Sequence, residues 1–68
     1  MYIITFGESG DLPEKADTLQ DVANIIIGYI NYDPLYKLED IEVFEIKKEL
    51  DIEPGNSIII NNKEYYKK

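Results

Sequence analysis

The chain of 68 residues contains no cysteine and no histidine. The first absence excludes disulfides, and the two together exclude the usual zinc sites. The missing imidazole also removes the most common general base of serine and cysteine hydrolases. A chain of this length buries only about 60% of its unfolded surface, so its stability depends on a well-packed apolar core. Homo-oligomerisation is one way to extend such a core.

Arginine is absent too, and fourteen acids face seven lysines, which gives a net charge of −7 at pH 7. The imbalance lies in residues 1–46, where ten acids accompany two lysines. Negative charge of this density repels nucleic-acid phosphates and anionic membranes, and it favours a basic protein partner. An acidic charge also keeps a small protein in solution without any partner, so both explanations of the charge stay open.

The sequence has no long apolar run. None approaches the roughly 18 residues of a membrane span, and the apolar start at residues 1–6 is too short for a signal-peptide core. We therefore expect a cytoplasmic protein that contacts neither membrane nor nucleic acid directly. The abundance of isoleucine, asparagine, lysine and tyrosine suggests an AT-rich genome, as in low-GC bacteria and their phages.

The first half of the chain predicts a strand, a loop and a helix. Residues 2–6 are β-branched and aromatic, which is typical of a strand, and an acidic loop follows. An amphipathic helix is predicted to begin after Thr18, its N-cap, and to end by Tyr32, since Asp33 precedes a proline. Gly28 within this helix costs about 1 kcal/mol relative to alanine, which raises the question of what approaches the helix there.

The second half predicts strands. Residues 41–46 fit a strand with both faces partly buried or with a bulge, and a helix is the alternative; the β-branched and aromatic residues favour the strand. For residues 35–40 the sequence allows either a helical turn or a loop. Pro54-Gly55 predicts a type II turn, and residues 57–66 predict a hairpin around Asn61-Asn62.

These elements give the order β-α-β-β-β in one domain over residues 1–68. The fold class is α+β, a two-layer domain in which one amphipathic helix packs on a small antiparallel or mixed sheet. The predicted core consists of apolar side chains from all of these elements: Ile3, Phe6, Leu19, Val22, Ile26, Ile30, Val43, Ile46, Ile58 and Ile60.

Three features resemble catalytic or metal sites without meeting their requirements. In Gly7-Glu-Ser-Gly-Asp11 the serine is followed at once by glycine, and no helix begins there, so Ser9 lies in a turn and is not a nucleophile. Residues 49–55 have the alternating acids of a calcium loop but lack its glycine and glutamate at the required positions. An extended segment with Leu50 and Ile52 pointing inward and the acids pointing to water explains the pattern better. Glu42 and Glu45 would need a cleft and burial to act as an acid and a base. We expect no enzyme activity, no catalytic residues, no cofactor and no metal.

Six tyrosines are many for this length, and tyrosine is enriched at protein interfaces. Three of them have roughly helical spacing and lie near acids in the sequence. We therefore predict an acidic, aromatic partner-binding surface formed by Tyr29, Tyr32, Asp33, Tyr36, Glu39 and Asp40. The alternative is that these tyrosines cover the edge of a small core.

Acids also recur every three or four residues at positions 8, 11, 14, 17 and 21. On a helix this spacing would place carboxylates about 5–6 Å apart, comparable to the charge spacing of a DNA strand. The sequence therefore predicts a small, acidic, non-catalytic protein-binding domain, encoded by a phage or other mobile element, with a DNA-mimic inhibitor of a nucleic-acid-binding host protein as the alternative.

Overall fold

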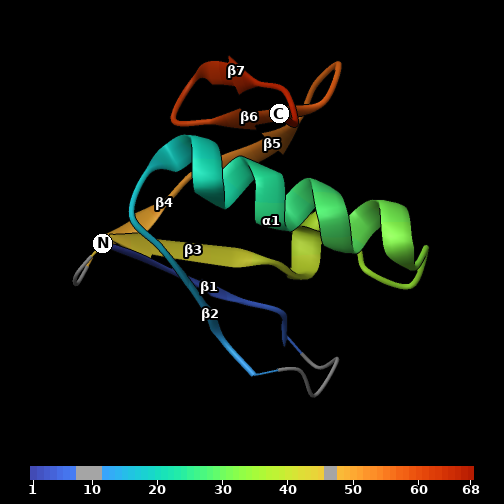
Figure 1. Ribbon diagram of the computed structural model, residues 1–68, viewed down its shortest axis with the longest axis horizontal. Helices are drawn as coiled ribbons and strands as arrows, with labels where there is room; N and C mark the ends of the chain where they lie inside the picture. The colour runs from blue at the N-terminus through green and yellow to red at the C-terminus, as the bar shows by residue number, and fades with distance from the viewer. Residues whose placement is uncertain (8–11, 46–47) are drawn as a thin grey trace.

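A computed structural model describes residues 1–7, 12–45 and 48–68. Within these residues one helix packs with two small antiparallel sheets, so the predicted α+β fold class is confirmed. The first sheet has the order β2-β1-β3-β4, and the second has the order β5-β6-β7. Figure 1 shows the helix running between the two sheets. The helix contacts β1 and β2 in the first sheet and β6 in the second.

The structure contains more strands than the sequence predicts. The first sheet contains β1 (Tyr2–Thr5), β2 (Glu14–Ala16), β3 (Glu42–Glu45) and β4 (Lys48–Leu50). The second contains β5 (Ile52–Pro54), β6 (Ile58–Ile60) and β7 (Lys63–Tyr65). Strand β2 lies in the stretch that was predicted as an acidic loop, so that prediction was wrong for residues 14–16. It pairs antiparallel with β1, with Lys15 opposite Ile3.

The helix α1 (Leu19–Tyr32) begins and ends as predicted. The Thr18 hydroxyl accepts a hydrogen bond from the Asp21 backbone N–H at 3.1 Å, which is the expected N-cap. Asp33 is the C-cap residue, and its backbone N–H donates to the Tyr29 carbonyl. The structure describes no other α-helix, and the 14 residues of α1 are too few to cross a bilayer.

Residues 35–40 form a turn followed by the 3₁₀ helix η2 (Leu38–Asp40). Residues 42–45 form a strand and not the alternative helix. The β1–β3 register runs without a break from Tyr2 opposite Glu45 to Thr5 opposite Glu42, so no bulge interrupts the strand. Val43 is buried and Phe44 is half-buried on the opposite face, which confirms that both faces are partly covered.

Of two predicted turns, one is confirmed and the other was assigned the wrong type. Asn61 and Asn62 adopt φ angles of 50° and 69°, as the predicted two-residue hairpin requires. Gly55 does not have the positive φ of a type II turn, so that turn type was wrong. Glycine is needed there for space, because a Cβ would lie 2.5 Å from Oε1 of Glu64. The Glu64 carboxylate accepts a hydrogen bond from the backbone N–H of Ser57 at 3.0 Å, which holds this turn against β7.

The chain passes from one sheet to the other at Asp51. The backbone N–H of Asn61 donates to the Asp51 carbonyl at 2.9 Å, and the backbone N–H of Asp51 donates to Oδ1 of Asn61 at 3.1 Å. The segment before and after this point keeps the predicted alternation, with Leu50 buried, Ile52 half-buried and the acids exposed. It is therefore two short strands, and not the loop that a calcium site would need.

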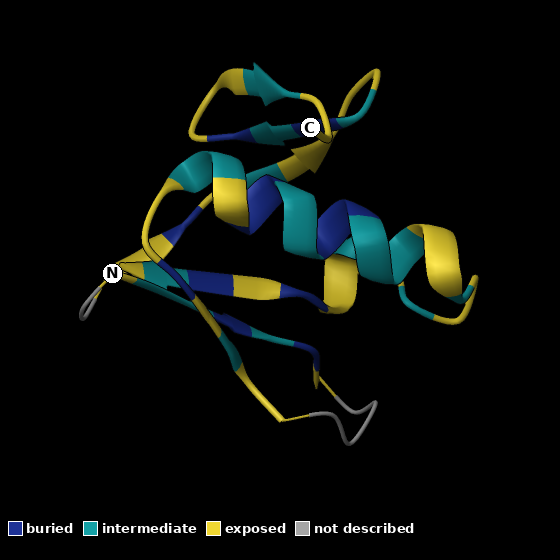
Figure 2. Cartoon of the chain, viewed as in Figure 1, coloured by how far each residue is buried: buried dark blue, intermediate teal, exposed yellow. Residues whose placement is uncertain are grey.

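The buried apolar residues form one cluster between α1 and the two sheets (Figure 2). Six of the ten predicted core residues are buried: Phe6, Val22, Ile26, Val43, Ile58 and Ile60. Leu19 and Ile30 are half-buried against the cluster, and Ile46 lies outside the described residues. Ile3 was wrong, because Ile4 is the fully buried residue of β1 and Ile3 points to the other face of the sheet.

Candidate functional site

The structure divides the predicted partner-binding surface into separate parts. Tyr29 and Tyr36 are half-buried and form an aromatic cluster with Phe6, which is almost fully buried. Ring centroids lie 4.2 Å apart for Phe6 and Tyr29, 5.2 Å for Tyr29 and Tyr36, and 6.1 Å for Phe6 and Tyr36. Contacts of this kind stabilise a core edge. The alternative prediction, that tyrosines cover the core, therefore describes these two rings.

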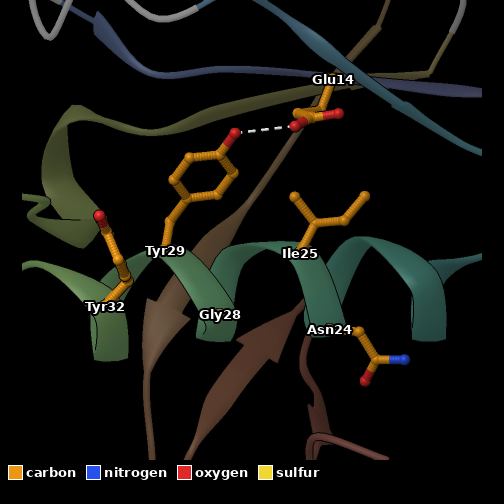
Figure 3. Close-up of a pocket in the computed structure, with 6 residues that line it drawn as sticks. All are labelled: Glu14, Asn24, Ile25, Gly28, Tyr29 and Tyr32. Carbon is orange, nitrogen blue, oxygen red and sulfur yellow. Dashed lines mark hydrogen bonds between the residues drawn. The ribbon is translucent and has the colours of Figure 1, made fainter.

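Tyr32 has a different environment. Its side chain is 86% exposed, and it lines a surface groove beside α1 together with Tyr29. The cavity has a volume of about 280 Å³. We call this the α1 groove, and its lining residues are Glu14, Asn24, Ile25, Gly28, Tyr29 and Tyr32 (Figure 3).

Strand β2 and the helix are joined across this groove. The Tyr29 hydroxyl donates a hydrogen bond to Oε2 of Glu14 at 2.7 Å, as Figure 3 shows. This contact orients the Tyr29 ring toward β2 and fixes the carboxylate of Glu14. It also explains why three residues of an acidic stretch form a strand here, since their pairing with β1 is supported by a side-chain contact to α1.

The chain after β7 lies against the same helix. The side chain of Gln20 donates a hydrogen bond to the Tyr66 carbonyl at 2.6 Å, and the backbone N–H of Lys68 donates to Oδ1 of Asn24 at 2.9 Å. A Cβ added at Gly28 would meet only the Nζ atom of Lys67, at an ordinary contact distance of 3.7 Å. Gly28 is therefore not required by close packing within the described chain.

Asp33 belongs to the predicted surface but does not line the α1 groove. Besides capping α1 through its backbone, it accepts a hydrogen bond at Oδ1 from the Leu35 backbone N–H at 2.9 Å. This is an Asx turn with the proline at position 34 at its centre. Leu35 beyond it is 82% exposed. The structure thus gives Asp33 a local role in ending the helix.

Glu39 and Asp40 line a second surface, on the other part of the predicted site. Two cavities of about 440 and 460 Å³ lie beside η2 and share Leu38, Glu39 and Ile52. We call them together the acidic groove, and its lining residues are Gly7, Lys37, Leu38, Glu39, Asp40, Ile41, Glu42, Glu49, Leu50, Asp51, Ile52 and Pro54. Among the residues that the structure describes, five carboxylates and one lysine thus surround apolar side chains from η2, β4 and β5.

The acids of this groove are brought together by the pairing of β3 with β4. Phe44 lies opposite Glu49, which places Glu42 diagonally next to Glu49 on the same face of the sheet. The pKa of the Glu49 carboxyl is raised above its usual value, first by a hydrogen bond with Glu42 and then by desolvation and by the negative charges of Glu42 and Asp51. The two carboxyls are therefore close enough to share a proton.

Sequence reasoning found Glu39 and Asp40 but missed Glu42, Glu49 and Asp51 as members of one surface. Glu42 was considered only with Glu45, which points to the opposite face of β3. The signal was the antiparallel pairing of β3 with β4, which brings Glu49 beside Glu42. Without the pairing register, this closeness is not visible in the sequence.

A second acid–hydroxyl contact lies at the far end of β3. The pKa of the Tyr2 hydroxyl is raised by desolvation, by the charge of Glu45 and by its hydrogen bond with that carboxylate.

Among the residues that the structure describes, no group of three or more acids is arranged to hold a metal ion. Ser9 lies outside the described residues. The expectation that the protein is not an enzyme stays a prediction.

The acids that were predicted at regular spacing do not lie on one helix. Positions 8 and 11 are outside the described residues. Glu14 is on β2, Asp17 precedes the helix, and Asp21 is in the first turn of α1. The regular helical spacing that a DNA mimic would use is therefore not formed by these three acids.

Comparison of the chain with family models, with curated proteins and with solved structures finds no match.

Proposed function

We propose that this protein is a small, cytoplasmic, non-catalytic binding domain that engages a basic protein partner through the acidic groove. The single observation that carries the proposal is the placement of five carboxylates around an apolar floor, opposed by one lysine. The abundance of isoleucine, asparagine, lysine and tyrosine, which suggests an AT-rich genome, supports a phage or mobile-element origin.

The charge arrangement favours a cationic partner for a physical reason. Carboxylates as close as those of Glu42 and Glu49 repel each other when both are ionised, and this repulsion adds to their hydrogen bond in raising the pKa of Glu49. An ammonium or guanidinium group of a partner would offset the repulsion. The remaining charge of the chain would increase the rate of encounter with a basic surface.

The floor of the groove supports a protein partner in particular. Leu38 and Ile52 are half-buried, and Ile41 and Leu50 are buried beneath the acids. The aliphatic stems of lysine and arginine pack on such apolar surface while their charged ends reach carboxylates. A metal ion would gain nothing from this floor.

The DNA-mimic inhibitor remains the alternative, since it also uses the negative charge. Its specific premise, a regular row of acids at positions 8–21, is weakened by the placement of Glu14 and Asp17 off the helix. The acids that gather in the acidic groove lie on η2, on β3 and around the β4–β5 bend. We therefore place the general binding function first.

The test is capture of partners from the source organism with three versions of the chain, at low and at high salt. The first is wild type, and the second is Glu42→Gln/Glu49→Gln. The third, Asp17→Asn/Glu53→Gln, removes the same charge from two exposed positions outside the acidic groove. We expect wild type and the control to retain one basic protein at low salt, and the groove variant to lose it.

Equal recovery by all three versions would contradict the proposal, because the acidic groove would then contribute nothing. If the captured protein binds nucleic acid, competition with duplex DNA distinguishes the alternative. A mimic is displaced by DNA at low salt, whereas a partner that binds elsewhere on the target is not.

A further inference from the structure

The outward face of α1 carries very little charge for a surface helix. Charged residues make up 31% of the chain, but Asp21 is the only one among the 14 residues of α1. Only four residues of the helix are buried, so the remaining ten positions are open at least in part to solvent. Surface helices normally carry charged side chains opposite the core. Depletion of charge is instead a property of the central part of protein interfaces.

The same face presents a projection next to a hollow. Tyr32 is 86% exposed, and it follows Gly28, which lines the α1 groove, by four residues or about 6 Å along the helix. Apart from the flexible end of Lys67, nothing in the described chain approaches the Cβ position of Gly28. A contact between two identical surfaces has to be self-complementary, so each copy must offer both a projecting and a receiving part. Tyr32 and Gly28 provide these two parts.

Charge decides which occupant this face suits. The acids nearest to it are Glu14 and Asp21, and the Nζ atom of Lys67 lies beside Gly28 on the same face. A basic partner would be drawn to the acidic groove, where the carboxylates are. A second copy carries the same net charge of −7 and is repelled by that groove, but it meets little repulsion at the near-neutral helix face.

We infer that the protein self-associates through the outward face of α1, with Tyr32 of one copy entering the hollow at Gly28 of the other. The contact is weak. A helix of 14 residues is about 21 Å long, and a contact limited to it buries less than the roughly 1,200 Å² that stable complexes bury. The chain therefore exists as monomer and dimer in an equilibrium that depends on its concentration.

Sedimentation velocity of the wild-type chain from about 10 µM to about 1 mM tests this inference. We expect the weight-average mass to rise from monomer toward dimer over this range. Raising the NaCl concentration from about 0.15 to about 0.5 M should leave the dissociation constant unchanged or lower it, because salt screens the repulsion between two acidic chains. A tenfold weakening in salt, or a monomer at every concentration, would overturn the inference.

Two variants locate the contact. Tyr32→Ser removes the projection at a highly exposed position without changing helix propensity, and Gly28→Gln fills the hollow while improving it. Each is expected to raise the dissociation constant at least tenfold. Leu12→Ser, at a position that is 84% exposed and does not line the groove, should leave it unchanged.

Because Gly28→Gln favours the helix, a monomer with this change cannot be explained by unfolding. A dimer that survives both Tyr32→Ser and Gly28→Gln would show that another surface is responsible, and it would overturn the assignment to α1.

Discussion

The two grooves of this protein differ in how they carry charge. The α1 groove lies on a helix with one charged residue, and the Nζ atom of Lys67 lies beside it. Among the described residues, the acidic groove gathers five carboxylates against one lysine, and its Glu49 has a raised pKa because of the neighbouring Glu42. The net charge of the chain is thus segregated and not spread evenly. A net charge alone would not show that one face attracts basic partners while another can meet a like-charged copy.

The largest expected effect comes from weakening the buried core that lies beneath both grooves. Ile26 of α1 and Ile41 of the acidic groove belong to the same buried cluster. Replacement of Ile26, which is fully buried, by alanine should lower the free energy of unfolding by about 2–5 kcal/mol. Urea denaturation followed by circular dichroism measures this loss. A loss below about 1 kcal/mol would mean that the two surfaces do not depend on one core.

Tyr29→Phe separates a structural role from a binding role within the α1 groove. The change keeps the ring contacts with Phe6 and Tyr36 but removes the hydrogen bond to Glu14. Stability should fall by about 1 kcal/mol, since the bond is partly buried and its acceptor is a carboxylate. Binding of a basic partner at the acidic groove should not change. Weaker partner binding with unchanged stability would reverse the roles that we assign.

Gly28→Ala tests whether the space beside Gly28 is open or filled by packing. The added methyl group would have only an ordinary contact with Lys67, so helix propensity should raise the stability by about 1 kcal/mol. Thermal unfolding of the monomer at low concentration measures this gain. Destabilisation would show that the hollow at Gly28 is occupied within the folded monomer.

The smallest effect concerns the charge of the acidic groove itself. A carboxyl whose pKa is raised on folding binds its proton more tightly in the folded state, so its contribution to stability falls as the pH rises through that pKa. Wild type should therefore lose stability relative to Glu49→Gln between about pH 4 and neutral pH. NMR titration should also find the pKa of Glu49 above its usual value, and Glu42→Gln should lower it. A parallel pH dependence of the two proteins would argue against a close pair of carboxyls.

The predictable parts of the structure were those set by local sequence. The helix from Leu19 to Tyr32 follows from the Thr18 cap and the spacing of apolar residues, and the Asn61-Asn62 hairpin follows from the tolerance of asparagine for positive φ. The inward Leu50 and half-buried Ile52 follow from simple alternation. These features need no knowledge of the rest of the fold.

The missed parts depend on contacts between distant residues. Strand β2 has one buried apolar residue, Ala16, and forms because β1 and α1 lie beside it. The choice of Ile3 together with Phe6 as core residues also overlooked strand alternation, because Ile4 shares a face with Phe6. The second sheet could not be separated from the first without knowing where the chain turns at Asp51.

The candidate site was predicted in its composition but not in its geometry. Tyrosines and acids at positions 29–40 marked the region, yet two tyrosines belong to the core edge and one acid ends the helix. The acids that complete the acidic groove come from β3 and from the β4–β5 segment, up to 11 positions beyond residue 40. Strand pairing brings them together, and this pairing cannot be predicted from the local sequence.

The most direct test of the binding account is an NMR titration of the isotope-labelled chain with a short synthetic peptide of alternating lysine and leucine. We expect backbone shifts to concentrate at Glu39, Glu42, Glu49 and Asp51, and we expect Glu42→Gln/Glu49→Gln to weaken binding at least tenfold relative to Asp17→Asn/Glu53→Gln. Shifts spread evenly over all acids, or equal affinity for the two variants, would contradict it.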